Sequence, residues 1–199
     1  MWKLAPNRSC FGIVAALTFM TSPHVTRTDD FEDCYRSANP DPKIHGCTNL
    51  IDGGQLEGDE LADAYYNRGN AYYGNGNLDR AIADYDEAIE IKPDYALVYT
   101  NRGVAYLAKG DPDRAISDHN FAITNKWRFA DAYYNSGNAY YSKGDLKHAI
   151  DDYKKAIEIT PDYAAAYANR SLAYRQRGKT KRAIADCEKA KSIDPEAKC

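Results

Sequence analysis

The sequence predicts an all-α fold in which similar helical hairpins follow one another, and three observations lead to this prediction. A block of residues recurs every 34 positions without an insertion or deletion. Within each block, small and aromatic residues are spaced so that they share one face of a helix. No segment shows the regular alternation of apolar and polar residues that is typical of a strand. The four blocks are residues 62–95, 96–129, 130–163 and 164–197.

The first and third blocks show the recurrence most clearly. Residues 62–73 are ADAYYNRGNAYY, and residues 130–141, which begin 68 positions later, are ADAYYNSGNAYY. Glycine and asparagine, as in residues 74–77, follow this first expected helix, and Pro93 or Pro161 follows the second. Each block therefore predicts two helices joined by a tight turn.

Positions within a block, counted from its first residue, explain why the two helices would pack. Positions 4, 8 and 11 share a face of the first helix, and positions 20, 24 and 27 share a face of the second. Small residues at positions 8, 20 and 27 allow close approach, and aromatic residues at positions 4, 11 and 24 fill the surrounding space. In the first block these residues are Tyr65, Gly69, Tyr72, Ala81, Tyr85 and Ala88.

This pattern resembles the tetratricopeptide-repeat (TPR) family, which also has proline at position 32. The first and third blocks match the family at all of these positions. The second block departs from it at His119 and Trp127, and the fourth departs at Ser171 and Cys187. The resemblance covers about two-thirds of the chain. It implies a right-handed α-solenoid that binds other proteins and needs no cofactor.

Charge divides the chain into three regions. Residues 1–27 contain three basic residues and no acidic one, residues 28–61 contain nine acidic residues against Arg36 and Lys43, and the remainder is nearly balanced. The net charge of the whole chain is only −3, which argues against electrostatic binding of nucleic acid.

Residues 1–27 are expected to form a leader. Lys3 and Arg8 precede an apolar run over residues 10–20, which is shorter than the roughly 20 residues needed to cross a bilayer. This arrangement suits a signal peptide for export to the periplasm or the exterior, although no A-x-A cleavage motif follows. The alternatives are an uncleaved membrane anchor or an unstructured leader on a cytoplasmic protein.

Residues 28–61 are expected to form a degenerate repeat that caps the array. Alignment with the first block puts Cys34 at position 11 and Cys47 at position 24, which belong to the packing shell of one hairpin. We hypothesise a Cys34–Cys47 disulfide, which an exported protein could form. The alternative is two reduced, buried cysteines. Whether Cys187 pairs with Cys199 is left open.

Positions 2, 5, 6, 9 and 12 lie opposite the packing face of the first helix, so they are expected to line the concave side of stacked hairpins. Tyrosines and amides predominate there, a composition suited to an extended peptide. The expected groove residues are Asp63, Tyr66, Asn67, Asn70, Tyr73, Asn101, Asp131, Tyr134, Asn135, Asn138, Tyr141 and Asn169.

Asparagine occupies position 6 of all four blocks, at Asn67, Asn101, Asn135 and Asn169. An amide offers a donor and an acceptor, so these residues could hold a peptide backbone, and their arrangement resembles the asparagine ladder known from TPR superhelices. Two alternatives remain: the amides bond within or between repeats, or they were simply copied when the repeats duplicated. A basic clamp for a chain-terminal carboxylate is not expected, because Tyr66, Asp131 and Asn135 stand where such a clamp has basic residues.

No catalytic or metal-binding constellation is apparent. The four histidines are scattered, and no nucleophile stands beside an oriented base. His119 is expected to pack in the core, and acidic residues of the second helices, such as Asp84 and Asp152, are expected to be solvated. The sequence therefore predicts a non-catalytic scaffold without cofactors that binds a protein or peptide partner. The alternative function is a self-associating structural protein of the cell envelope, that is, a homo-oligomer.

Overall fold

A computed structural model of the chain describes residues 24–125 and 130–199. Within these residues the fold consists of ten α-helices and contains no strand, which confirms the expected all-α class. The helices are α1 (His24–Arg36), α2 (Pro40–Asp52), α3 (Gly58–Gly74), α4 (Leu78–Ile91), α5 (Ala96–Ala108), α6 (Pro112–Asn125), α7 (Ala130–Ser142), α8 (Leu146–Ile159), α9 (Ala164–Gln176) and α10 (Thr180–Ile193).

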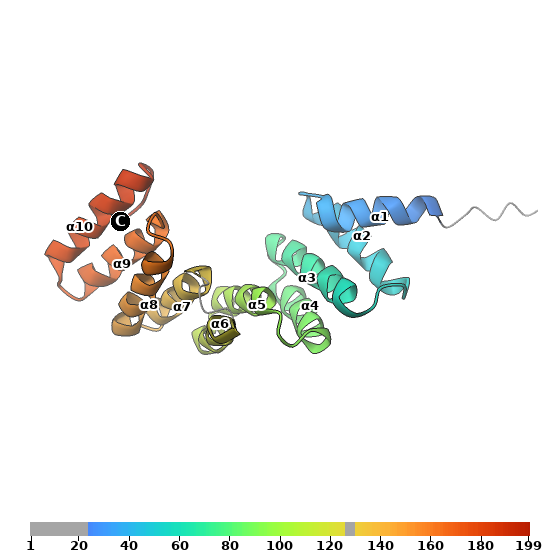
Figure 1. The fold of residues 1–199 in the computed structure, drawn as a ribbon, viewed down its shortest axis with the longest axis horizontal. Helices are drawn as coiled ribbons and strands as arrows, with labels where there is room; N and C mark the ends of the chain where they lie inside the picture. Colours follow the sequence, from blue (N-terminus) through green and yellow to red (C-terminus); the bar gives the residue numbers. More distant parts are fainter. Residues whose placement is uncertain (1–23, 126–129) are drawn as a thin grey trace, which may run out of the picture.

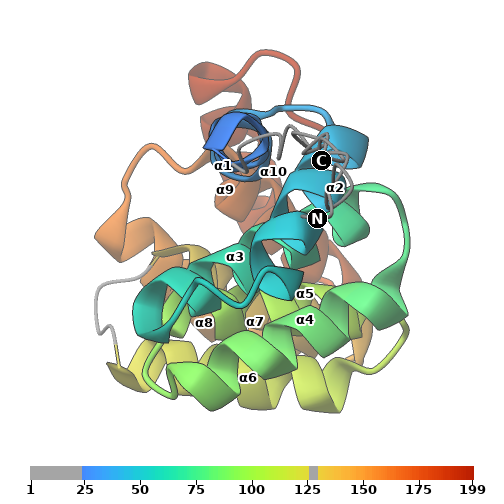
Figure 2. The ribbon, with the colours of Figure 1, turned by 90° about the vertical axis from the view of Figure 1, so that its right-hand side faces the viewer.

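Consecutive helices pack as five hairpins, and each hairpin stacks on the next to form a curved array (Figure 1). The hairpin α1–α2 lies at one end of the array and α9–α10 at the other. The first helices of successive hairpins also contact one another, from α3 through α5 and α7 to α9. These first helices therefore form one continuous surface, which Figure 2 shows from the α1 end.

Glycine at position 15 of each repeat makes the turn between the two helices. Gly76 and Gly144 have φ values of 73° and 83°, in the left-handed region that side chains disfavour. The backbone N–H of Asn77 donates to the carbonyl of Tyr72 at 2.8 Å, which ends α3 in the manner typical of a glycine C-cap. The Asn77 side chain then accepts from the N–H of Arg80 and caps α4.

The close approach at position 8 is confirmed in the first and third repeats. A Cβ atom added to Gly69 would lie 2.8 Å from the ring of Tyr85, and one added to Gly137 would lie 2.6 Å from the ring of Tyr153. Both tyrosines are about 1% exposed. The glycine at position 8 therefore makes room for the aromatic ring at position 24.

His119 takes the place of this tyrosine in the second repeat and is fully buried, so its expected packing role is confirmed. A Cβ atom on Gly103 would lie 2.6 Å from its ring. Neither ring nitrogen has a hydrogen-bond partner. Burial lowers the pKa of His119 to about 4, so the imidazole is neutral near pH 7.

The hairpin α1–α2 lies in the region for which a capping repeat is expected. Cys34 and Cys47 are fully buried between its helices, their Cα atoms are 4.6 Å apart, and their sulfur atoms are at disulfide-bonding distance. Gly46 permits this packing, because a Cβ atom there would lie 2.5 Å from the carbonyl oxygen of Asp30. Residues 58–61, the last of this region, already belong to α3.

At the other end of the chain, the sulfur atoms of Cys187 and Cys199 are also at bonding distance. The last residues therefore fold back toward α10. The signal-peptide hypothesis concerns residues 1–27, of which residues 1–23 lie outside the described part of the chain and residues 24–27 belong to α1. None of the helices described is both long and apolar enough to cross a membrane.

Candidate peptide-binding groove

The expected groove residues belong to the first helices of the four TPR hairpins, α3, α5, α7 and α9. In Figure 1, α3 and α5 lie on the inner side of the curved array, and their partners α4 and α6 lie on the outer side. The polar groups of the inner surface are not evenly distributed along it. They form two clusters, one at the junction of the first and second repeats and the other at the junction of the third and fourth.

The first amide–tyrosine cluster consists of Tyr66, Asn70, Tyr85 and Asn101. The side-chain oxygen of Asn70 accepts from the Tyr85 hydroxyl at 2.8 Å and from Asn101 Nδ2 at 2.8 Å. The same Nδ2 also donates to the Tyr66 hydroxyl at 3.2 Å. The cluster therefore joins α3, α4 and α5 by side-chain hydrogen bonds.

The second amide–tyrosine cluster, Tyr134, Asn138, Tyr153 and Asn169, repeats this arrangement 68 residues later. Asn138 Oδ1 accepts from the Tyr153 hydroxyl at 2.9 Å and from Asn169 Nδ2 at 2.8 Å. The same Nδ2 donates to the Tyr134 hydroxyl at 3.1 Å. The recurrence found in the sequence is thus a recurrence of one hydrogen-bonded unit.

An aspartate–tyrosine contact lies beside each cluster. The Tyr95 hydroxyl donates to Asp63 at 2.6 Å, and the Tyr163 hydroxyl donates to Asp131 at 2.7 Å. Burial, together with the adjacent carboxylate, raises the pKa of Tyr95 and of Tyr163, so both hydroxyls stay protonated as donors. These contacts hold the two aspartates at the edge of the groove.

The four asparagines at position 6 fall into two classes. Asn101 and Asn169 bond to the preceding repeat, as one of the alternative interpretations proposed. The side chains of Asn67 and Asn135 form no hydrogen bond with the residues described. The difference follows from position 9 of the preceding repeat, because Asn70 offers an acceptor to Asn101, whereas Val104 offers none to Asn135.

A small cavity of about 110 Å³ adjoins the second cluster. Asn138, Tyr153 and Asn169 form part of its wall, and Tyr141 and Leu172 supply the rest. The Tyr141 hydroxyl accepts a hydrogen bond from Gln176. The cavity therefore combines apolar walls with the amide groups of the cluster.

Comparison with protein-family models matches the repeats directly. A model described as "TPR repeat" covers residues 69–110 and 137–174, and one described as "Tetratricopeptide repeat" covers residues 164–197. Together they cover just over half of the chain.

This chain belongs to the TPR family. Solved structures agree with that assignment. A crystal structure of MamA is 25% identical in sequence and superposes with a TM-score of 0.70 over 79% of this chain and 90% of that one. MamA from Desulfovibrio magneticus is 17% identical, with a TM-score of 0.76 over 86% of this chain and 94% of the other. The right-handed α-solenoid is thereby confirmed.

A third structure is described as YrrB, a TPR protein with an unusual peptide-binding site. It is 19% identical, with a TM-score of 0.64 over 79% of each chain. A search of curated protein sequences gave no match. The family match and these neighbours support a protein-interaction scaffold.

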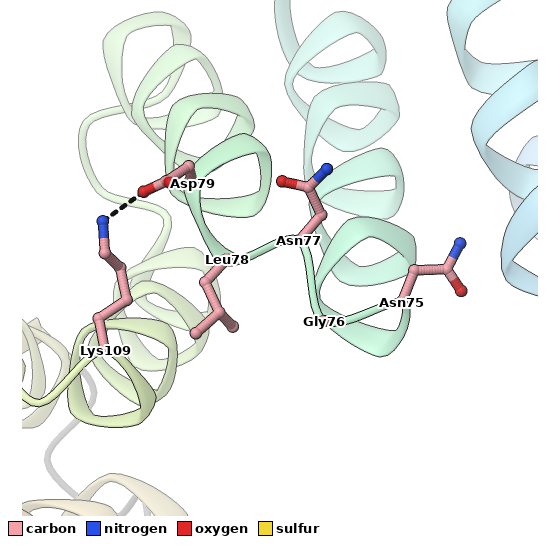
Figure 3. Close-up of a pocket in the computed structure, with 6 residues that line it drawn as sticks. All are labelled: Asn75, Gly76, Asn77, Leu78, Asp79 and Lys109. Carbon is pink, nitrogen blue, oxygen red and sulfur yellow. Dashed lines mark hydrogen bonds and ion pairs between the residues drawn. The ribbon is translucent and has the colours of Figure 1, made fainter.

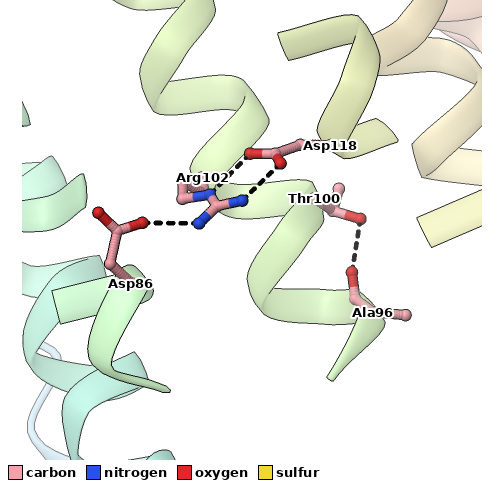
Figure 4. Close-up of polar contacts among 5 residues, drawn as sticks. All are labelled: Asp86, Ala96, Thr100, Arg102 and Asp118. Carbon is pink, nitrogen blue, oxygen red and sulfur yellow. Dashed lines mark hydrogen bonds and ion pairs between the residues drawn. The ribbon is translucent and has the colours of Figure 1, made fainter. Parts of the chain in front are cut away.

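A second polar network lies between the helices of the TPR hairpins. Arg102 donates from Nε and Nη2 to Asp118 at 2.8 and 2.7 Å, and from Nη1 to Asp86 of the preceding repeat at 2.6 Å (Figure 4). Arg68 forms the same two hydrogen bonds with Asp84, and Arg170 forms them with Asp186. Bidentate pairs of this kind fix both the distance and the orientation of the helices that they join.

The expectation of solvated acidic residues is therefore wrong for position 23. Asp84 and Asp118 are each only 5% exposed, because the arginine at position 7 neutralises them between the helices. The sequence contained the signal, since arginine at position 7 and aspartate at position 23 recur together.

The third TPR repeat lacks this arginine. Ser136 stands at position 7 and is fully buried, and Asp152 stands at position 23. Neither the Ser136 hydroxyl nor Oδ2 of Asp152 has a hydrogen-bond partner. Burial accordingly raises the pKa of the Asp152 carboxyl.

A larger hollow of about 470 Å³ lies at the turn between α3 and α4 (Figure 3). Its polar groups already have partners in the protein: Lys109 pairs with Asp79, Asn77 caps α4, and Asn75 donates to Asp41. In residues 24–125 and 130–199, no group of three or more His, Cys, Asp and Glu side chains is placed to hold a metal ion. The two inner clusters remain the best candidate binding site.

Proposed function

We propose that this TPR protein is a non-catalytic scaffold that binds an extended segment of a partner protein along the groove formed by α3, α5, α7 and α9. The observation that carries the proposal is the hydrogen-bonding capacity left over in each amide–tyrosine cluster. Counting donors and acceptors in the second cluster shows what remains for a ligand.

Both protons of Asn169 Nδ2 are used, one toward Asn138 and one toward Tyr134. The side-chain oxygen of Asn138 accepts two hydrogen bonds, which satisfies its usual capacity. The groups left over are the NH₂ of Asn138, the side-chain oxygen of Asn169 and the hydroxyl proton of Tyr134. The cluster therefore retains both donor and acceptor capacity for a ligand.

A peptide group presents the complementary pair, one C=O acceptor and one N–H donor. Each cluster could therefore hold one peptide group whatever side chain it carries. The apolar cavity beside the second cluster would receive a neighbouring small apolar side chain. The likeness to YrrB, described as having a peptide-binding site, supports the same use of the inner surface.

The test uses peptides selected from a random display library on the native protein. The double variant Asn70→Asp/Asn138→Asp keeps both accepting oxygens but replaces each free NH₂ by an acceptor. Selected peptides should bind this variant at least about tenfold more weakly in fluorescence polarisation, since a lost hydrogen bond costs about 1–3 kcal/mol.

A matched control is Asn120→Asp, which makes the same chemical change at an exposed position of α6. It should leave affinity unchanged. Equal affinity of the double variant and the native protein, with both fully helical by circular dichroism, would contradict the role of the clusters.

We further propose that the protein works outside the cytoplasm, in the periplasm or as a secreted chain. The basic and apolar leader of the sequence and the two cysteine pairs at bonding distance support this location. Detection of a processed chain, beginning close to α1, in the envelope or culture fluid would test it. A chain found only in the cytoplasm with its leader intact would exclude it.

A further inference from the structure

The last helix of the array exposes a surface that is covered in every earlier repeat. Isoleucine occupies position 21 of all four repeats. Ile82, Ile116 and Ile150 are 9%, 9% and 7% exposed, because the following repeat packs on them. The equivalent residue of α10, Ile184, is 54% exposed. The folded-back C-terminal residues therefore do not cover it.

The charge at this surface is reversed relative to the inner junctions. At two earlier junctions a lysine at position 14 pairs with an aspartate at position 18 of the preceding repeat, as Lys109 does with Asp79 and Lys143 with Asp113. At position 18 of α10 stands Lys181 instead. Exposed residues of α10 include Lys181, Arg182, Lys189 and Lys191, with Glu188 as the one exposed acid of this helix.

The opposite end of the same molecule carries the opposite charge. Residues 28–61 contain nine acidic and two basic residues, a net charge of −7, whereas residues 164–197 contain four acidic and eight basic residues, a net charge of +4. Exposed acids of α1 include Asp29 and Glu32. Figures 1 and 2 show α1 and α10 at the two ends of the array.

We propose that α10 of one molecule binds the acidic α1–α2 hairpin of a second copy, head to tail. Burial of Ile184 and attraction between the unlike ends would both favour this contact. The two surfaces differ, so each dimer still has one free acidic end and one free basic end, and the association can continue into a chain of molecules. This interface is separate from the inner groove and does not depend on its function.

The test is sedimentation equilibrium of the full chain, purified from an exporting host, over a range of protein concentrations. The average mass should rise with concentration at about 0.01 M ionic strength. It should fall toward the monomer at about 1 M, because the Debye length shrinks from about 30 Å to about 3 Å. A monomer at every concentration in low salt would overturn the proposal.

Charge-reversal variants would identify the two surfaces that bind each other. A variant with Lys181→Glu, Lys189→Glu and Lys191→Glu should associate at least about tenfold more weakly. A variant with Asp29→Lys and Glu32→Lys should also be weakened. Mixing the two variants should restore association, because the acidic α10 of the first variant can then bind the basic α1 of the second.

The control is Lys154→Glu/Lys155→Glu on the exposed side of α8, which should associate as the native protein does. Circular dichroism establishes that each variant is folded. Association that survives both reversals, or a mixture that stays monomeric, would show that other surfaces are used and would overturn the proposal. Neither result would bear on peptide binding, which the cluster variants measure separately.

Discussion

Asn169 donates a hydrogen bond from its side-chain nitrogen to the side-chain oxygen of Asn138, at 2.8 Å across the junction of the third and fourth repeats. Asn101 does the same to Asn70 in the first half of the array. These bonds orient both amides, so that the groups that the proposed ligand would meet are held in place in its absence. A pre-oriented site loses less conformational entropy on binding than a mobile one.

The Cys34–Cys47 pair should stabilise the first hairpin when oxidised. Replacing both cysteines with serine should lower the free energy of unfolding by about 3 kcal/mol, as expected for a disulfide that closes a loop of this size. Urea unfolding of the oxidised native protein and the variant would measure the difference. Adding a reductant to the native protein should remove most of this difference in the free energy of unfolding. Free thiols at both positions in exported protein would refute the disulfide.

Asp152, whose repeat has Ser136 instead of arginine at position 7, should reduce stability near neutral pH. Its pKa is raised in the folded state, so the ionised form is disfavoured there, and the penalty disappears as the pH falls and the carboxyl is protonated. Asp152→Asn should therefore raise the melting temperature at pH 7, and it should raise the melting temperature less at acidic pH.

The matched substitution one repeat later should have the opposite effect. Asp186 holds Arg170 in a bidentate pair, so Asp186→Asn would leave the arginine without its partner and lower the melting temperature. If both substitutions shift the melting temperature in the same direction, the account of these two sites is wrong.

His119 should make the protein sensitive to acid. Its pKa is about 4 in the folded state and near 6.5 in the unfolded chain, so the unfolded state binds the proton more strongly. Above about pH 6.5, protonation of His119 should not reduce the free energy of unfolding. As the pH decreases from about 6.5 to about 4, the free energy of unfolding should fall by about 1.4 kcal/mol for each pH unit. Urea unfolding at several pH values would measure the slope.

His119→Phe provides the comparison for that experiment. An aromatic ring already occupies this position in the first and third repeats, and Phe brings no titratable group. The variant should be similar to the native protein near pH 7.5 and more stable near pH 4.5. Parallel pH profiles of the two proteins would contradict the assignment to His119.

Arg102 should not be replaceable by lysine. Its guanidinium makes three hydrogen bonds to two aspartates from different repeats, and an ammonium group cannot reproduce that planar geometry. Arg102→Lys should lower the free energy of unfolding by about 1–2 kcal/mol. Arg36→Lys, at an exposed ion pair in α1, should change it by no more than about 0.5 kcal/mol.

Much of the fold could be predicted from spacing alone, since Gly69 and Tyr85 contact each other as the repeat pattern requires. The sequence did not reveal that Asn101 and Asn67 differ. That difference depends on which residue of the preceding repeat faces each amide, and a helix-by-helix pattern contains no such information. The burial of Asp84 was missed for a different reason: its partner Arg68 lies 16 residues away on another helix, and only the joint recurrence of arginine at position 7 and aspartate at position 23 indicates the pair.

The duplication of the amide–tyrosine cluster has a consequence for how long a ligand stays bound. A flexible chain that carries two suitable stretches could occupy both clusters at once, and release from one would leave it tethered close to the other. The local concentration of the freed stretch would then favour rebinding over escape. Avidity of this kind would give two individually weak contacts a long combined lifetime.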